Sequence, residues 1–162
     1  MKRISIGLLL TFVLLIIFSA CKEDKWLDWK NLNDEWYAKH KNDDGFHTTS
    51  SGLAYQIIYA GAPTLRKPDA NSVVVVNYKG SLIDGSVFDT ALNDSTATLY
   101  LPNTVSGWQE GLKMVHNGAH IKLYIPSELG YGTSTSNSLI PPHSVLIFDI
   151  YLKDSYYYPK SN

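Results

Sequence analysis

Cysteine is almost absent from this sequence, which contains only Cys21. A single cysteine cannot form a disulfide within one chain, so the fold does not depend on a disulfide framework. An excess of charge of either sign is also missing, because 14 Lys and Arg residues stand against 15 Asp and Glu residues. Nucleic-acid-binding domains carry a basic footprint, and this balance argues against that class. The 162 residues leave room for one ordinary domain.

The sequence also lacks an apolar run long enough to cross a bilayer. Its longest apolar stretch, Ile6 to Phe18, has about 13 residues, whereas a spanning helix needs roughly 20. Two basic residues precede this stretch and two small residues follow it, which is the layout of a secretory signal peptide. We therefore expect residues 1–20 to be a signal peptide that is cleaved.

Cys21 ends the segment Phe18-Ser19-Ala20-Cys21, which resembles a bacterial lipobox with Phe18 in place of the usual Leu. In that motif the cysteine is lipidated and becomes the first residue of the mature protein. Two or more acyl chains hold a protein stably on a membrane. The prediction is a protein of the cell envelope, lipid-anchored to the outer membrane through Cys21 and not cytoplasmic. A plain signal peptide or uncleaved anchor with an incidental cysteine is the alternative.

The segment Lys22-Glu23-Asp24, directly after the cysteine, resembles the export signal of bacterial surface lipoproteins. Three charged residues also make an ordinary solvated leader. Exposure on the cell surface and attachment facing the periplasm therefore both stay open.

Aromatic residues recur at spacings of three and four between Asp24 and Lys41, which is a helical period. The residues on this face are Trp26, Trp29, Asn33, Trp36 and Tyr37. Gly45 permits the left-handed conformation that closes helix ends, so we place the end of this segment near residue 45. Residues 21–45 are predicted to be a lipidated leader and amphipathic helix. The helix can dock on its own domain, pair two chains as a homodimer, collect substrate or lie at the lipid interface, and the sequence does not choose.

Strand signals separated by turn residues dominate after residue 45. The predicted strands include Leu53–Tyr59, Val73–Tyr78, His120–Ile125 and Val145–Leu152, with a hairpin turn at Asp84-Gly85. One short helix is predicted, opened by Gly107 and carrying Trp108, Leu112 and Met114. The predicted fold class is α+β, an antiparallel sheet of five to six strands curled over one short helix. Residues 46–154 form this domain and residues 155–162 a polar tail.

Several short motifs then occur in a specific order along this domain. They are Val76-Asn77-Tyr78-Lys79-Gly80, Asp84-Gly85, Phe88-Asp89, Gly107-Trp108-Gln109-Glu110-Gly111-Leu112, Ile125-Pro126, Gly130-Tyr131-Gly132, Ile140-Pro141-Pro142-His143 and Leu146-Ile147-Phe148-Asp149. This order resembles that of the FKBP-type peptidyl-prolyl cis-trans isomerases, from about Thr48 to Leu152. The lead-in from Thr48 to Leu53 resembles bacterial secreted members of that family.

The resemblance implies an isomerase that acts on Xaa-Pro bonds of exported proteins as they fold, with proline-containing polypeptides as partners and without a metal or other cofactor. It implies an apolar cup with Trp108 as its floor. The implied walls are Tyr78, Phe88, Val105, Ile140 and Phe148. The Tyr131 hydroxyl and the backbone N–H of Ile140 are implied to bind substrate carbonyl groups, and Asp89 to act as an acceptor and orienting group at the rim.

Two segments depart from the family pattern. In Ala97-Thr98-Leu99-Tyr100 one aromatic wall is replaced by Ala97 or Leu99, and Thr104-Val105 replaces a Val-Ile pair. Both changes widen the cup or make it less apolar. They leave open an alternative function, a non-catalytic FKBP-fold chaperone or binding module for apolar or proline-containing segments.

Two other classes of site are not indicated. His116, His120 and His143 lack the spacing of metal-ligand pairs. No Gly-Xaa-Ser-Xaa-Gly elbow arranges a serine for nucleophilic catalysis.

Overall fold

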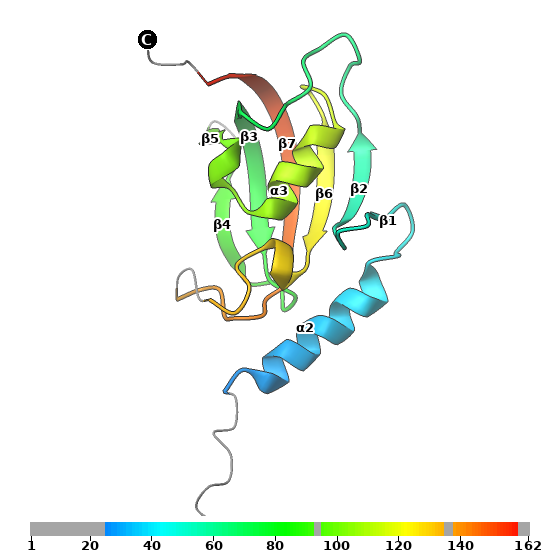
Figure 1. The fold of residues 1–162 in the computed structure, drawn as a ribbon, viewed down its shortest axis with the longest axis vertical. Helices are drawn as coiled ribbons and strands as arrows, with labels where there is room; N and C mark the ends of the chain where they lie inside the picture. Colours follow the sequence, from blue (N-terminus) through cyan, green and yellow to red (C-terminus); the bar gives the residue numbers. More distant parts are fainter. Residues whose placement is uncertain (1–24, 93–94, 135–137, 159–162) are drawn as a thin grey trace, which may run out of the picture.

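A computed structural model of the protein describes residues 25–92, 95–134 and 138–158. The predicted signal peptide, Cys21 and the segment Lys22-Glu23-Asp24 lie outside the described residues. The strands are β1 (His47–Thr48), β2 (Ala54–Tyr59), β3 (Ser72–Ser81), β4 (Val87–Ala91), β5 (Ala97–Tyr100), β6 (His120–Ile125) and β7 (Leu146–Tyr157). They form one antiparallel sheet in the order β1-β2-β6-β7-β3-β4, and β5 pairs with β3 (Figure 1).

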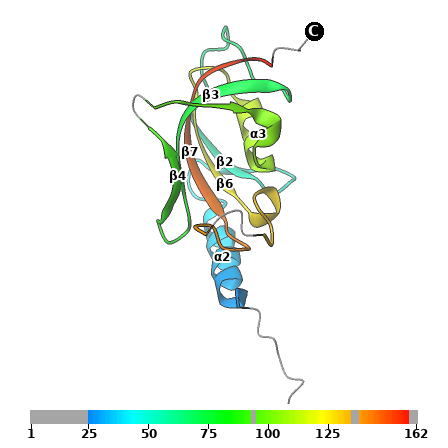
Figure 2. The same cartoon turned by 90° about the vertical axis from the view of Figure 1, so that its left-hand side faces the viewer.

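The helix α3 (Ser106–Gly111) lies against one face of this sheet and continues into the 3-10 turn η2 (Leu112–Met114) (Figure 2). Its backbone approaches β6 closely, because a Cβ atom added to Gly107 would lie 2.6 Å from Cγ2 of Ile125. Trp108 and Leu112 from this face join the buried core of the sheet. The predicted α+β class is confirmed, with seven strands in the described part of the chain instead of five to six.

Strand β7 is longer than the sequence predicted, since it continues to Tyr157, past the expected end at Leu152 and the expected boundary at 154. The pairing with β3 shifts by one residue at Lys153, which forms a bulge. Beyond the bulge, Ser155 pairs with Val74 and is 4% exposed. The bulge and the two charged residues Lys153 and Asp154 interrupt the apolar alternation, so the pattern stopped at Leu152 while the sheet did not.

The helix predicted before the domain is α2 (Leu27–His40), and its aromatic face packs on its own domain (Figure 1). The Trp36 ring meets Tyr124 of β6 edge-on at 5.0 Å between ring centroids. The Tyr37 hydroxyl donates a hydrogen bond to the carbonyl oxygen of Gly52. The sequence left several partners open for this helix, and the structure shows it packed on its own domain. None of the helices within the described ranges is long and apolar enough to cross a membrane.

Candidate active site

A cavity of about 460 Å³ lies beside α3, where β3, β4, β5 and β7 meet the turn before that helix and the segment Gly130-Tyr131. Its described lining residues are Tyr78, Asp89, Leu99, Asn103, Thr104, Val105, Ser106, Trp108, Gly130, Tyr131 and Phe148. Six of the eight residues predicted for the cup are therefore brought together around one cavity. The lining is aromatic at the base and polar at one side.

The base of the cavity is built from three aromatic rings that hold one another in place. Trp108, which is 3% exposed, meets Tyr78 and Phe148 edge-on, in each case at 5.1 Å between ring centroids. Edge-to-face pairs are a preferred aromatic geometry and restrict ring rotation. The indole Nε1 of Trp108 is buried and has no hydrogen-bond partner among the described residues. The floor is therefore a preformed, largely apolar surface that can receive a compact apolar ring.

Gly80 on β3 is the backbone position that lets two phenylalanine rings pack over the strand. A Cβ atom at Gly80 would lie 2.6 Å from Phe88 Cε2 and 2.8 Å from Phe148 Cε1. Phe88 meets Phe148 edge-on at 5.5 Å and supports the wall, but it is not among the described residues that line the cavity. Ile140 is also absent from that lining; it is 2% exposed and belongs to the buried core. Both predicted wall residues thus pack behind the cavity and are not among its described lining residues.

The polar side of the cavity centres on Asp89. The Tyr78 hydroxyl donates to Asp89 Oδ2 at 2.5 Å, and the Thr90 backbone N–H donates to Oδ1 at 2.9 Å. Both carboxylate oxygens are therefore held in position. Burial raises the pKa of Tyr78, and the hydrogen bond to Asp89 and the negative charge of that carboxylate raise it further. Tyr78 consequently stays protonated and keeps donating at neutral pH.

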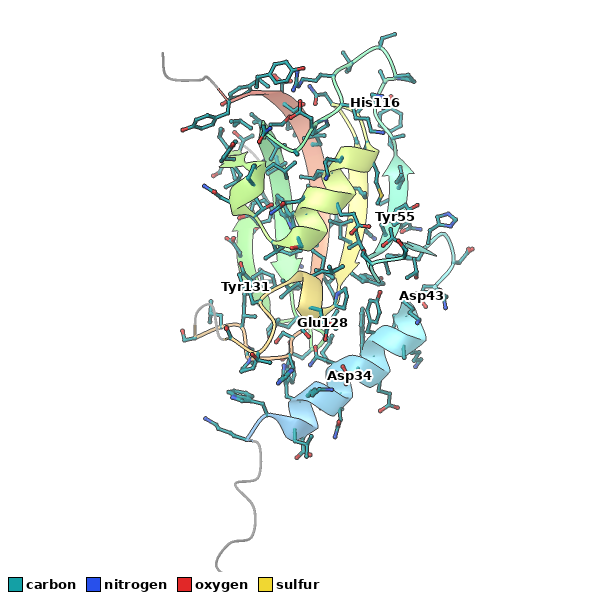
Figure 3. The ribbon with its side chains drawn as sticks, in the orientation of Figure 1. Asp34, Asp43, Tyr55, His116, Glu128 and Tyr131 are labelled. Atoms are coloured by element: carbon teal, nitrogen blue, oxygen red, sulfur yellow. The ribbon has the colours of Figure 1, made fainter. Side chains whose placement is uncertain are left out.

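Tyr131 also lines the cavity, just after the 3-10 turn η3 (Ser127–Leu129) (Figure 3). It is 39% exposed, so its hydroxyl is accessible to a bound molecule. The Gly132 backbone N–H donates to the Ser127 carbonyl oxygen at 2.8 Å, which closes this turn directly after Tyr131. The site therefore combines a buried aromatic floor with an accessible hydroxyl donor at its edge.

Sequence reasoning missed part of the lining. Asn103, Ser106 and Gly130 were not predicted, although each lies within two residues of a predicted residue in the chain. Leu99 and Thr104, which were noted as departures from the family pattern, both line the cavity. The only available signal was this adjacency, because the chain turns sharply before α3 and brings several consecutive residues to the opening.

The turn before α3 is held by a side chain of the turn itself and by one from the helix. Gln109 Nε2 donates to the Thr104 carbonyl oxygen at 2.8 Å, and Thr104 Oγ1 donates to the carbonyl oxygen of Leu101, in the 3-10 turn η1 (Leu101–Asn103), at 2.7 Å. Thr104 thus has a structural role in addition to lining the cavity. The hydroxyl that departs from the apolar family pattern is used inside the turn, where it reduces the polarity offered to a bound molecule.

The three histidines considered for a metal have different surroundings. Figure 3 shows His116 and Tyr131 toward opposite ends of the domain. His120 Nε2 contacts Asp149 Oδ1 at 2.6 Å and its ring stacks on Tyr151. His143 lines a separate cavity of about 300 Å³ beside α2. In the part of the chain that the structure describes, no group of three or more His, Cys, Asp or Glu side chains is arranged to hold a metal ion.

Comparisons with known proteins agree on one family. A family model described as FKBP-type peptidyl-prolyl cis-trans isomerase matches residues 65–153. FKBP-type peptidyl-prolyl cis-trans isomerase FkpA of Escherichia coli (strain K12) is 41% identical over 129 residues, which cover 79% of this chain and 47% of the relative. Peptidyl-prolyl cis-trans isomerase Mip of Coxiella burnetii is 38% identical over 114 residues, which cover 70% of this chain and 49% of that protein. This chain spans about half the length of these curated relatives.

Solved structures give the same result. The crystal structure of FkpA from Escherichia coli superposes with a TM-score of 0.73 at 30% sequence identity, covering 98% of this chain and 85% of that chain. A peptidyl-prolyl cis-trans isomerase from Pseudomonas syringae also superposes with a TM-score of 0.73 at 30% identity, covering 83% of this chain and 98% of that chain.

Proposed function

This chain belongs to the FKBP-type peptidyl-prolyl cis-trans isomerases, and on that premise we propose that it accelerates rotation about Xaa-Pro bonds in polypeptides. The chemical problem is the resonance of the peptide bond, which puts the barrier to rotation at about 18–20 kcal/mol. Uncatalysed exchange at Xaa-Pro bonds takes tens to hundreds of seconds and can limit folding. The observation that carries the proposal is the aromatic cavity with Tyr131 and Asp89 at its edge.

The aromatic floor accounts for the choice of proline. A proline ring is compact and apolar, and it fits a cavity whose base is Trp108 with Tyr78 and Phe148 beside it. Contact with these rings removes water from the substrate. In the twisted transition state the nitrogen becomes pyramidal and loses resonance, so its charge separation falls. A water-poor apolar site therefore favours this state over the planar ground state.

The polar edge supplies the orienting interactions. We assign the Tyr131 hydroxyl as a donor to a substrate carbonyl, because it is accessible and next to the cavity. Asp89 is held through both carboxylate oxygens and accepts from Tyr78, so it fixes the ring at one wall. Prearranged groups of this kind stabilise a transition state without reorganising during the reaction. Rotation breaks no covalent bond, so no nucleophile or proton transfer is required.

The test is the cis-to-trans rate of a short Xaa-Pro peptide with purified protein beginning at Lys22. The parent protein should accelerate the reaction in proportion to its concentration. Tyr131→Phe should retain the fold and lower kcat/KM about two- to tenfold, because one neutral hydrogen bond contributes about 0.5–1.5 kcal/mol. Tyr151→Phe on β7, outside the described cavity lining, is the matched control and should behave like the parent.

A folded parent protein that leaves the rate unchanged would contradict the proposal. Suppression of the aggregation of an unfolded client by that same inactive protein would favour the binding module. The segment with Ala97 and Leu99, one of which replaces an aromatic wall of the family and of which Leu99 lines the cavity, would then explain the loss of turnover.

We further propose that the protein acts in the cell envelope, attached to the outer membrane through lipidated Cys21, and that exported proteins are its clients. The support is the sequence of residues 1–24, with its signal-peptide layout and lipobox-like end. Expressed in bacteria with labelled palmitate, the full chain should carry the label and sediment with membranes. The Cys21→Ser variant should lose both properties, and an unlabelled parent recovered in the soluble fraction would argue against the anchor.

A further inference from the structure

Helix α2 makes a specific buried contact with the loop that leads into β7. The Asn33 side chain is 0% exposed, and both ends of its amide are used. Its Nδ2 donates to the Trp29 carbonyl oxygen at 2.8 Å, and its Oδ1 accepts from the Val145 backbone N–H at 2.7 Å. A buried amide is costly unless its hydrogen bonds are made. This geometry therefore holds the helix and the loop in one relative position.

A second hydrogen bond joins the same helix to the same loop. Trp29 Nε1 donates to Ser144 Oγ at 3.0 Å, and Ser144 Oγ donates to the Pro141 carbonyl oxygen at 2.7 Å. The Ser144 hydroxyl thus connects the helix to Pro141, at the start of the segment from Pro141 to Val145, which we call the 141–145 loop. Trp29 also packs against the buried core. We call the contacts of Trp29 and Asn33 with this loop the brace.

The 141–145 loop in turn contacts the segment that carries Tyr131. The His143 backbone N–H donates to the Gly132 carbonyl oxygen at 2.8 Å, and Gly132 directly follows Tyr131. His143 has a φ of 63°, the only positive value for a non-glycine residue in the described ranges. Such a conformation costs energy and persists where the surrounding structure holds it. The loop also enters β7, which carries Phe148.

The helix is attached separately at its other end. Tyr37 donates to the Gly52 carbonyl oxygen, before β2, and the Trp36 ring meets Tyr124 on β6. Between the two attachments lies the cavity of about 300 Å³, lined by Asp34 and Tyr37 on the helix and by Glu128 and His143 on the domain. Figure 3 shows Asp34 on α2 near the segment that carries Glu128, with Tyr131 farther along that segment. The brace is thus the attachment closest to the isomerase site in the hydrogen-bond network.

We propose that Trp29 and Asn33 are positioning residues, through which α2 holds the 141–145 loop and thereby the Tyr131 segment of the isomerase site. This inference rests on the proposed function. Small displacements of a hydroxyl donor lower the rate of a reaction that depends on orientation. Loss of the brace should therefore affect the rotation step more than the binding of the proline ring, which the aromatic floor controls.

The experiment compares Asn33→Ala and Ser144→Ala with Tyr37→Phe, which removes the hydrogen bond of the same helix to Gly52 and none to the loop. In Asn33→Ala and Ser144→Ala, kcat should fall about three- to tenfold while KM stays within about twofold of the parent value. Tyr37→Phe should keep both parameters. Parent-like kcat in both brace variants, or an equal fall in Tyr37→Phe, overturns the proposal.

Amide hydrogen exchange gives a second readout that does not depend on activity. Exchange at the His143 and Val145 amides should accelerate at least about tenfold in Asn33→Ala and remain unchanged in Tyr37→Phe, because local opening exposes amides whose hydrogen bonds are lost. An inactive parent protein would refute the isomerase function, and the exchange result would still decide whether the brace orders the loop. Unchanged exchange in Asn33→Ala overturns the brace in either case.

Discussion

Phe148→Ala should lower kcat/KM for Xaa-Pro isomerisation by about 30-fold or more. The Phe148 ring lines the cavity and meets Trp108 and Phe88 edge-on. A buried phenylalanine side chain contributes about 1.5–3 kcal/mol through the apolar surface it covers. About 2 kcal/mol lost from the transition state corresponds to roughly 30-fold in rate. Loss of the ring also removes one of the two edge-on contacts that hold Trp108.

The measurement needs a variant that separates activity from stability, because a Phe→Ala change in a core costs about 3–5 kcal/mol of folding free energy. Phe148→Leu fills most of the space and should remain folded. It should still lose most of the acceleration, since the edge-on aromatic contacts are absent. The matched control is Phe46→Ala, which removes a ring stacked on Tyr124 outside the described cavity lining.

Rates are compared at a temperature where circular dichroism shows each variant to be folded. The control Phe46→Ala should isomerise like the parent protein. If folded Phe148→Leu and Phe148→Ala both kept the parent rate, the aromatic cavity would not be the site of the reaction.

Gly107→Val should reduce the free energy of unfolding by about 3 kcal/mol or more, and Gly107→Ala by a smaller amount. A Cβ atom at this position would lie 2.6 Å from Ile125 Cγ2, with other Ile125 atoms at 2.8 Å. Overpacking a close-packed core costs about 1–3 kcal/mol and sometimes more, and valine adds two further methyl groups to the clash. Helix propensity alone would predict a gain of about 1 kcal/mol for Gly→Ala, so the sign of the alanine result tests the close approach.

Urea unfolding followed by tryptophan fluorescence measures these differences. Ser106→Val in the same helix is the control, because Ser106 is exposed and its replacement should change stability by less than about 1 kcal/mol. A stabilised Gly107→Ala would show that α3 can move away from β6 without cost. The close packing of the helix on the sheet would then not restrict which residues position 107 tolerates.

Much of the fold was predictable because its signals are local in the chain. The alternation at His120–Ile125 predicted β6 at the bounds the structure has, and the Asp84-Gly85 turn joins β3 to β4 as expected. The aromatic period of three and four predicted α2 with its inward face. The end of β7 was wrong because a bulge at Lys153 broke the alternation. A bulge depends on the partner strand, and the sequence of one strand does not contain it.

The candidate site was predictable as far as the order of its motifs resembles a known family. Six of the predicted residues line one cavity, and the family resemblance is confirmed by the comparisons. Phe88 and Ile140 were expected at its surface, but Phe88 supports Phe148 and Ile140 is part of the core. Whether a large apolar residue lines a cavity or packs behind it depends on a few ångströms of backbone position. Residue type does not distinguish the two.

The fold class, the family and the order of the elements can be inferred from the sequence alone, because they follow from periodicity, turn residues and motifs that are read along the chain. The contacts of α2, in contrast, are visible only in the folded protein. Asn33 and Val145 are 112 positions apart, and nothing in the local pattern of either residue indicates the other. A buried hydrogen bond depends on two groups meeting at one distance and angle, which is a property of the folded backbone and not of either segment alone.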